Sequence, residues 1–448
     1  MLQYLLPFFP PVLLFGAVFL NTSRRFLAWL VVVSASLSGI LVPSPYLNPL
    51  ARYLTGFFCS WFIIWSANLL LIKDPITLQR IQKGPGSRGH IWQPLPPSHS
   101  LARARWAIDL ALNFRAVGWN FANRQWQHPP ITPTLQVGTH SRDIKASGSN
   151  HVGISQSLFL RRSCRRLFAS SMWLAGYPCL VRDTTLPIPA EVRHFLRPVH
   201  EQKQGSLTGL LLLATTLYMF IDGIHALVSL VAVGLLRDEK WRYPPFFGPV
   251  KYLLSGRLQD LWGKFWHDLL KEGLLATSSG IIPWKQSQAL WSVARIWACF
   301  VLTGLVHASA SYAVTREPRP SLNAGVFYCL QPLGILAQMA IGGAMQTVLP
   351  KSAVSAIDLA VATLWLSSCF PWISGDPALR QVIGVIRHLS NKHTTPPGSE
   401  ITNEANAAPG PNRNGSRNFP NPGRNATADG VNPRLVPEIV RDADASTT

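Results

Sequence analysis

Residues 290–315 read LWSVARIWACFVLTGLVHASASYAVT, an apolar stretch whose single charged side chain is Arg295. About 20 predominantly apolar residues are enough to cross a bilayer as a helix. His307 lies about 25 Å along such a helix, counted from Leu290 at about 1.5 Å per residue. An ionisable side chain at membrane depth is costly and is kept where it serves a function. The stretch therefore predicts a transmembrane helix that carries a functional histidine.

Further apolar runs of similar length occur along the chain, at 2–20, 26–42, 55–72, 208–236, 322–349 and 353–373. A shorter run, 167–181, is ambiguous because 15 residues also suit a buried or interfacial helix. The sequence predicts an all-α integral membrane protein, a bundle of about eight transmembrane helices around an intramembrane cavity. The expected parts are N-terminal transmembrane helices (1–72), a basic loop (73–206), a catalytic membrane domain (207–375) and a disordered tail (391–448).

The distribution of charge orients these spans. The chain has 41 Lys and Arg against 21 Asp and Glu, and segment 73–166 alone has 14 basic and 3 acidic residues. Basic loops stay on the cytosolic side, so this segment is predicted to be cytosolic. Segment 237–289 is cytosolic too if 167–181 crosses the membrane, which favours that crossing. We expect a multi-pass protein of the endoplasmic reticulum membrane that contacts lipid and not nucleic acid, since no nucleic-acid-binding signature accompanies the charge.

Within the basic loop, residues 104–122 place Leu110, Phe114, Val117 and Phe121 on one stripe of a helix. Such an amphipathic helix lies either in the membrane interface or against the bundle. The tail 391–448 is rich in Pro, Asn, Gly, Ser and Thr, with few aromatic residues, which is typical of disorder.

A second histidine ends the run LQDLWGKFWH at 258–267. Trp262 and Trp266 are predicted to share one helical face next to His267. The group could line an active site, or it could form an ordinary aromatic belt at the membrane surface. Lys264 would suit the phosphates of a nucleotide-bearing donor, although lysines at a cytosolic boundary are common.

The apolar run 208–236 contains a second polar group, Asp222 and His225, three positions apart on one helical face. This pair could line the acceptor cavity or serve helix packing. His307 likewise has two interpretations. A neutral imidazole at that depth can take a proton from a substrate hydroxyl, or it can bond to a carbonyl of a neighbouring helix.

Several chemistries lack their signatures. The six cysteines form no CxxC, so no metal site is expected. No histidine begins an HxxxD, and GxSxG, P-loop and GxGxxG motifs are absent. The sequence therefore gives no support for a soluble acyltransferase, a serine hydrolase or a nucleotide-driven pump.

The motifs resemble the wax synthase domain, which is related to the membrane-bound O-acyltransferases and includes fungal terpenoid and meroterpenoid acetyltransferases. The resemblance covers roughly 55–375 and rests on PPFFG (244–248), the 255–267 run, TGLVH (303–307), LALNFRAVGW (110–119) and KDP (73–75). Four residues depart from the usual pattern without removing either histidine: Gln259, Leu261, Thr303 and Ala116.

The resemblance implies acyl transfer from acetyl-CoA, a co-substrate, to a lipophilic alcohol, with no bound cofactor. It implies His307 as the general base and His267 as the group that orients the donor or stabilises the oxyanion. It also places Trp262 and Trp266 in the tunnel wall. Further residues expected to bind substrate or donor are Asp260, Lys264, Asp222 and His225.

Three other functions remain open from the sequence. A long-chain wax or sterol ester synthase differs in the acyl donor. A multi-span transporter would show an internal repeat and broken helices, and neither is found. A membrane terpene cyclase would need acidic residues in the spans, where Asp222 and Asp358 are the candidates.

Overall fold

The computed structural model describes residues 8–42, 45–84, 90–97, 100–122, 155–181, 207–282 and 288–392. The chain divides into two units, Met1–Thr395 and Pro396–Thr448, and the second lies outside the described residues. Most of the predicted disordered tail therefore lies outside them too. Its first two residues do not: they end helix α16 (Pro377–Lys392), so the helical part of the chain extends past residue 390.

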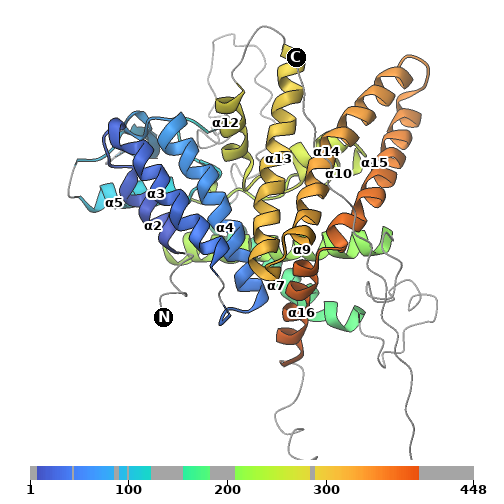
Figure 1. Cartoon of the computed structure of the whole chain (residues 1–448), viewed down its shortest axis with the longest axis horizontal. Helices are drawn as coiled ribbons and strands as arrows, with labels where there is room; N and C mark the ends of the chain where they lie inside the picture. Colours follow the sequence, from blue (N-terminus) through green and yellow to red (C-terminus); the bar gives the residue numbers. More distant parts are fainter. Residues whose placement is uncertain are drawn as a thin grey trace, which may run out of the picture. The chain divides into compact units, whose positions relative to one another are not determined.

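Six helical spans in the described part of the chain are long and apolar enough to cross a membrane. They lie close to six of the predicted runs: Thr22–Leu41, Pro49–Ile72, Gly209–Leu235, Leu290–Thr315, Pro318–Met345 and Lys351–Ser374. They are formed by α3 (Thr22–Leu41), α4 (Pro49–Ala67), α9 (Leu207–Ser229), α13 (Gln288–Thr315), α14 (Pro318–Met345) and α15 (Lys351–Ser374). Two of the spans extend beyond their α-helix into a π-helical segment, Asn68–Ile72 after α4 and Leu230–Leu235 after α9. The all-α, multi-span prediction is confirmed (Figure 1).

The other two predicted spans are not among the six. α2 (Phe9–Ala17) is the described part of the run 2–20. The run 167–181 forms the second half of a longer helix, α7 (Gln156–Val181), whose first half contains four arginines. A total of about eight crossings thus stays a prediction.

The remaining described α-helices are α5 (Leu101–Leu112), α10 (Lys251–Leu254), α11 (Leu258–Asp260) and α12 (Lys271–Ile281). α5 ends at Leu112, and Asn113 leaves the helical conformation (φ −86°, ψ 72°). The prediction of one helical stripe over 104–122 is therefore wrong beyond Leu112. Two turns replace the helix: the amide of Ala116 donates to the carbonyl of Asn113, and the amide of Trp119 donates to that of Ala116.

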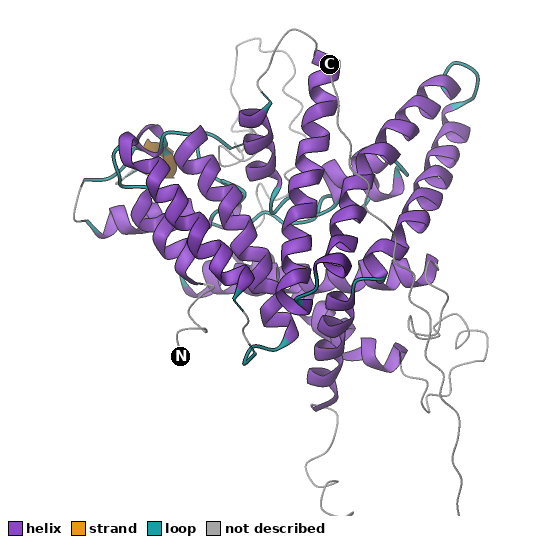
Figure 2. Ribbon diagram, in the orientation of Figure 1, coloured by secondary structure: helices purple, strands orange, loops and turns teal. Residues whose placement is uncertain are grey.

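A small hairpin was not predicted. β1 (Arg80–Lys83) pairs antiparallel with β2 (His90–Gln93), and Arg80 also bridges to Trp119 (Figure 2). These strands are four residues each, too short to leave a clear alternating pattern in the sequence.

α13 lies between α4 and α14 and packs on both (Figure 1). Small residues allow this close approach, as is usual between transmembrane helices. A Cβ added at Gly56 would lie 2.7 Å from the carbonyl oxygen of Ser309, and one at Gly304 would lie 2.8 Å from that of Gly325. The crossings fall on either side of His307 and place it between the three helices.

Candidate active site

His307 is held by side chains from the two neighbouring helices. Its Nδ1 lies 3.1 Å from the hydroxyl of Tyr53 on α4. Its ring stacks on Tyr328 of α14, with centroids 4.3 Å apart and planes at 19°, and meets Phe57 edge-on at 5.4 Å. The alternative partner considered from the sequence, a backbone carbonyl, is not what Nδ1 contacts. One ring nitrogen is thus fixed by a phenol.

His267 sits in a loop whose backbone is fixed by the PPFFG segment. The amide of Gly248 donates to the carbonyl of Phe265 (2.9 Å), and the amide of Asp268 donates to that of Phe246 (3.0 Å). A Cβ at Gly248 would overlap the carbonyl oxygen of Lys264, so the two chains touch backbone to backbone. This contact explains why a glycine ends the motif.

The prediction that Trp262 and Trp266 share a regular helical face is wrong. Residues Leu261–Phe265 form a π-helical turn, and Trp266 is extended (ψ 144°). Trp262 and Trp266 still meet edge-on, with centroids 6.1 Å apart. Their proximity comes from the wide turn followed by a sharp change of direction, which a four-residue spacing alone does not reveal.

The structure brings the two histidines together, since His267 and His307 are near enough to interact electrostatically. Aromatic rings connect them: Trp266 lies beside His267, Trp262 beside Trp266, and Tyr328 between Trp262 and His307. Burial lowers the pKa of His267 to about 4, with its own backbone acting in the opposite direction. His267 is therefore neutral near pH 7.

Two buried polar atoms of this cluster have no hydrogen-bond partner in another described residue. Nε1 of Trp262 has no hydrogen-bond partner among the described residues, and Nδ1 of His267 has none apart from its own backbone. A buried donor or acceptor left unpaired is costly. Both atoms would be satisfied by a polar group of a bound molecule.

Arg115 was not singled out from the sequence, yet it ties the LALNFRAVGW element to both sides of the His267 loop. Its guanidinium donates to the carbonyls of Pro244 and Pro245 (2.5 and 3.1 Å) and to the Asp268 carboxylate (2.8 Å). The side chain of Arg115 is 6% exposed. A planar, forked donor suits such a set of acceptors. The signal in the sequence that could have found this role is the place of Arg115 inside the LALNFRAVGW element.

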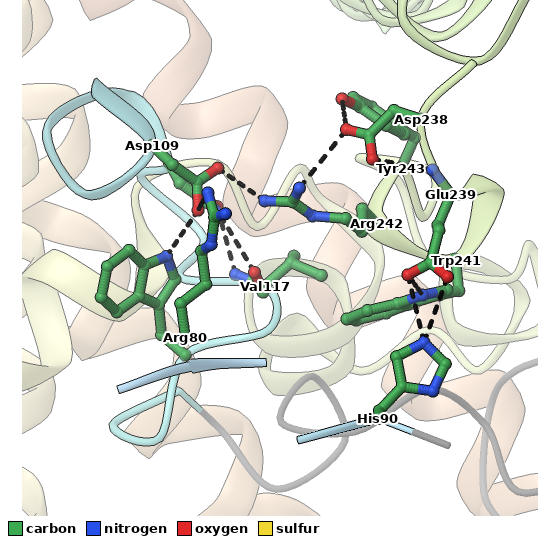
Figure 3. A network of polar contacts seen from close by, with 11 residues as sticks. Arg80, His90, Asp109, Val117, Asp238, Glu239, Trp241, Arg242 and Tyr243 are labelled. Atoms are coloured by element: carbon green, nitrogen blue, oxygen red, sulfur yellow. Dashed lines mark hydrogen bonds and ion pairs between the residues drawn. The ribbon is translucent and has the colours of Figure 1, made fainter. Parts of the chain in front are cut away.

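A second polar network holds the same regions together (Figure 3). Asp109 of α5 accepts from Trp119 (3.1 Å) and from Arg242 (2.7 Å), and Arg242 also reaches Asp238 (3.4 Å). The hydroxyl of Tyr243 donates to Asp238 (2.6 Å). Burial and the hydrogen bond to Asp238 raise the pKa of Tyr243. This network anchors the segment that leads into PPFFG.

The predicted pair Asp222 and His225 lies on α9, where both residues are buried. Arg166 of α7 forms an ion pair with Asp222 and also approaches Nδ1 of His225 (3.1 Å). The ring of His225 packs on Phe246 at 4.4 Å. Asp222 is thus charge-paired, and the pair borders the PPFFG segment and not the two catalytic candidates directly.

Asp260 and Lys264 form an ion pair with each other (2.6 Å), and the side chain of Lys264 is 54% exposed. Neither forms a hydrogen bond or an ion pair with His267 or His307, so the structure does not gather them with the histidines. No group of three metal-ligating side chains occurs in the described part of the chain.

An open groove of about 470 Å³ lies at the end of the second described span. Its lining includes Ile72, Lys73, Phe121, Glu272 and Ser279. Lys73 lies 4.4 Å from the centre of the Phe121 ring, and burial lowers its pKa while Glu272 acts in the opposite direction. Neither histidine lines this groove.

Comparison with known proteins finds a family match for one segment of the chain. Residues 243–330 match the family model described as the membrane bound O-acyl transferase family. This range contains PPFFG, His267 and His307. No solved structure matches the chain.

Three fungal proteins are similar to it. Acetyltransferase sirH of Emericella nidulans is 24% identical over 234 residues, which are 51% of this chain and 48% of that protein. Acetyltransferase spyB of Aspergillus fumigatus is 22% identical over 44% of this chain and 34% of its own length. O-Mevalon transferase macI of Penicillium terrestre is 28% identical over 28% of this chain and 33% of its own length. The matched part of the chain spans less than half the length of each of these relatives. The family match and these relatives confirm the resemblance that the motifs indicated.

Proposed function

We propose that this chain, an integral membrane protein of the membrane bound O-acyl transferase family, transfers an acetyl group from acetyl-CoA to a hydroxyl of a terpenoid or meroterpenoid alcohol. The observation that carries the proposal is the meeting of His267 and His307, from segments 40 residues apart, among aromatic rings. The names of two relatives, both acetyltransferases, support acetyl as the acyl group. The endoplasmic reticulum is the membrane we propose for it.

His307 is the proposed general base. Its free ring nitrogen, Nε2, takes the proton of the alcohol while the alcohol oxygen attacks the thioester carbonyl. A C–O bond forms, and the carbonyl π electrons move to oxygen. When that oxyanion collapses, the C–S bond breaks, and the thiolate of CoA leaves and takes the proton from the imidazolium. The products are an ester and CoA, and His307 is neutral again.

His267 is the proposed second polar group. Because it stays neutral, its ring offers one N–H, which can donate to the oxyanion or to the thioester carbonyl. Trp262 and Trp266 would wall the tunnel, and the unpaired Nε1 of Trp262 offers another donor. The positioned base contributes about 10²–10⁴-fold, and the rest comes from orientation and the exclusion of water.

The acceptor end of the site is proposed to lie toward α9. His225 packs on Phe246 and Tyr218 packs on Phe247 at 4.3 Å, so the buried face of α9 covers the PPFFG segment. The ion pair between Asp222 and Arg166 fixes this face. A largely apolar lining suits a lipophilic alcohol.

The test uses microsomes from cells that express the chain, radiolabelled acetyl-CoA, and a panel of prenol, sesquiterpene, diterpene and sterol alcohols. We expect ester formation that His307→Ala abolishes and that His90→Ala leaves intact, since His90 lies on β2, pairs with Glu239 and bonds to neither catalytic candidate. Competition with palmitoyl-CoA tests the donor: effective competition would favour a long-chain ester synthase. Full activity of His307→Ala, or no ester from any alcohol with the protein folded, would refute the proposal.

A further inference from the structure

The phenol that contacts His307 comes from outside the segment that matches the family. Tyr53 lies on α4, and its hydroxyl is 3.1 Å from Nδ1 of His307. A phenol can donate or accept a hydrogen bond. If Tyr53 accepts from Nδ1–H, the lone pair of the imidazole is confined to Nε2. That is the tautomer which can take a proton from a substrate.

A carboxylate lies behind this phenol. Asp376 follows α15 and is 1% exposed, and its charge acts on Tyr53. It accepts from the hydroxyl of Ser311 (2.7 Å) and from the amide of Ala378 (2.9 Å) at the start of α16. Ser311 is one helical turn after His307 on α13, so the same face of that helix presents both residues.

Several described contacts hold the Asp376 carboxyl in place. Burial raises its pKa, while the bonds from Ser311 and from the amides of Ala378 and Leu379, and the charge of Arg380, act in the opposite direction. The three donors and the nearby cation offset part of the cost of burying the charge of this carboxyl. The same contacts hold the carboxyl in place.

The charge requirement of the reaction fits this arrangement. Proton transfer to His307 leaves an imidazolium in a dry, membrane-embedded cluster, and an unpaired charge there is costly. A preorganised negative charge lowers that cost without reorganisation during the reaction. The histidine of the serine-protease triad has the same need and meets it with an aspartate that contacts Nδ1 directly.

We propose that Tyr53 is a positioning residue, which accepts a hydrogen bond from Nδ1–H of His307 and keeps Nε2 free, and that Asp376 stabilises the imidazolium through Tyr53. The inference rests on the proposed function, because it assigns the residues behind the proposed base. It adds two residues, from α4 and from the start of α16, to the two histidines.

The test compares Tyr53→Phe, Asp376→Asn and the double variant with wild type, on the alcohol that wild type acetylates. Because the lost contact matters most in the transition state, Tyr53→Phe should lower kcat by roughly 10–100-fold with the KM for acetyl-CoA within about twofold. Asp376→Asn should lower kcat by roughly 3–30-fold, again with KM unchanged. Since Asp376 acts through Tyr53, the double variant should be no worse than Tyr53→Phe within about threefold.

Tyr252→Phe is the matched control, since it removes a hydroxyl from a ring beside Lys264 on the exposed side. Wild-type kcat in Tyr53→Phe, or a loss confined to KM, would overturn the positioning role. Additive losses in the double variant would overturn the role of Asp376. If Tyr53→Phe fails to accumulate, Asp376→Asn decides alone, with an unchanged kcat refuting the proposal. Absence of transfer by wild type would refute the proposed function instead.

Discussion

Arg115→Lys removes a forked donor while it keeps the positive charge. The guanidinium of Arg115 donates three hydrogen bonds, to Pro244, Pro245 and Asp268. A lysine ammonium can keep the contact with Asp268, but it cannot span all three acceptors. One or two bonds that involve a charged group are then lost, at about 1.5–3 kcal/mol each, so the variant should be less stable by roughly 1.5–6 kcal/mol.

The loss should appear in both stability and activity. At about 2–4 °C per kcal/mol, the thermal midpoint of the purified protein in detergent should fall by at least about 3 °C, measured by tryptophan fluorescence. Arg115 bonds to Asp268, next to His267, and to the PPFFG segment that packs on this loop. A displacement of about 1 Å can cost about 10²-fold in rate. We therefore expect kcat for acetyl transfer to fall by at least about tenfold.

The matched control is Arg105→Lys, on the exposed side of α5. Surface substitutions of this kind change stability by less than about 0.5 kcal/mol. If Arg115→Lys behaves like Arg105→Lys in both measurements, the fork is not what holds the His267 loop, and the reasoning from its three bonds is wrong.

Three further predictions concern the same region. Ala116 is buried in the left-handed conformation (φ 52°), so Ala116→Gly should relieve about 1–2 kcal/mol of strain against about 0.8 kcal/mol for the lost methyl group, and a thermal midpoint below wild type would contradict this. Gly248→Ala should abolish folding or transfer, because its Cβ meets backbone that cannot give way; wild-type yield and activity would refute the contact. His267 has a pKa of about 4 in the folded protein, below the ordinary value of about 6.5, so the unfolded chain binds a proton at higher pH than the folded protein does. Stability should therefore fall as the pH drops from about 6.5 toward 4. His267→Gln should lose less stability than wild type between about pH 7 and 4.5, and an equal loss would exclude this cause.

The spans could be predicted because each is decided within its own residues. The apolar run 290–315 coincides with the described span Leu290–Thr315, and 353–373 lies within Lys351–Ser374. Composition over about 20 residues is enough when the surrounding solvent is hydrocarbon. Whether 167–181 crosses the membrane was harder to predict, because the run is short and four arginines precede it in the same helix.

The two histidines could be found from the sequence, but not the residues that hold them. Arg115 lies 153 positions from Asp268, and Tyr53 lies 254 positions from His307. Nothing in the local pattern of either residue marks its distant partner. The end of α5 at Leu112 was missed for a related reason. The apolar periodicity continues to Phe121, but buried contacts of the turn decide the conformation there.

The segment that carries the family signature depends on an earlier part of the chain. Residues 243–330 contain both imidazoles, whereas the phenol on α4 and the guanidinium after α5 come from residues 53 and 115. A fragment trimmed to residues 243–330 would keep both histidines and lose the residues that position them. Chimeras with related transferases should therefore exchange the first 122 residues together with residues 243–330, so that each histidine stays with the residue that positions it.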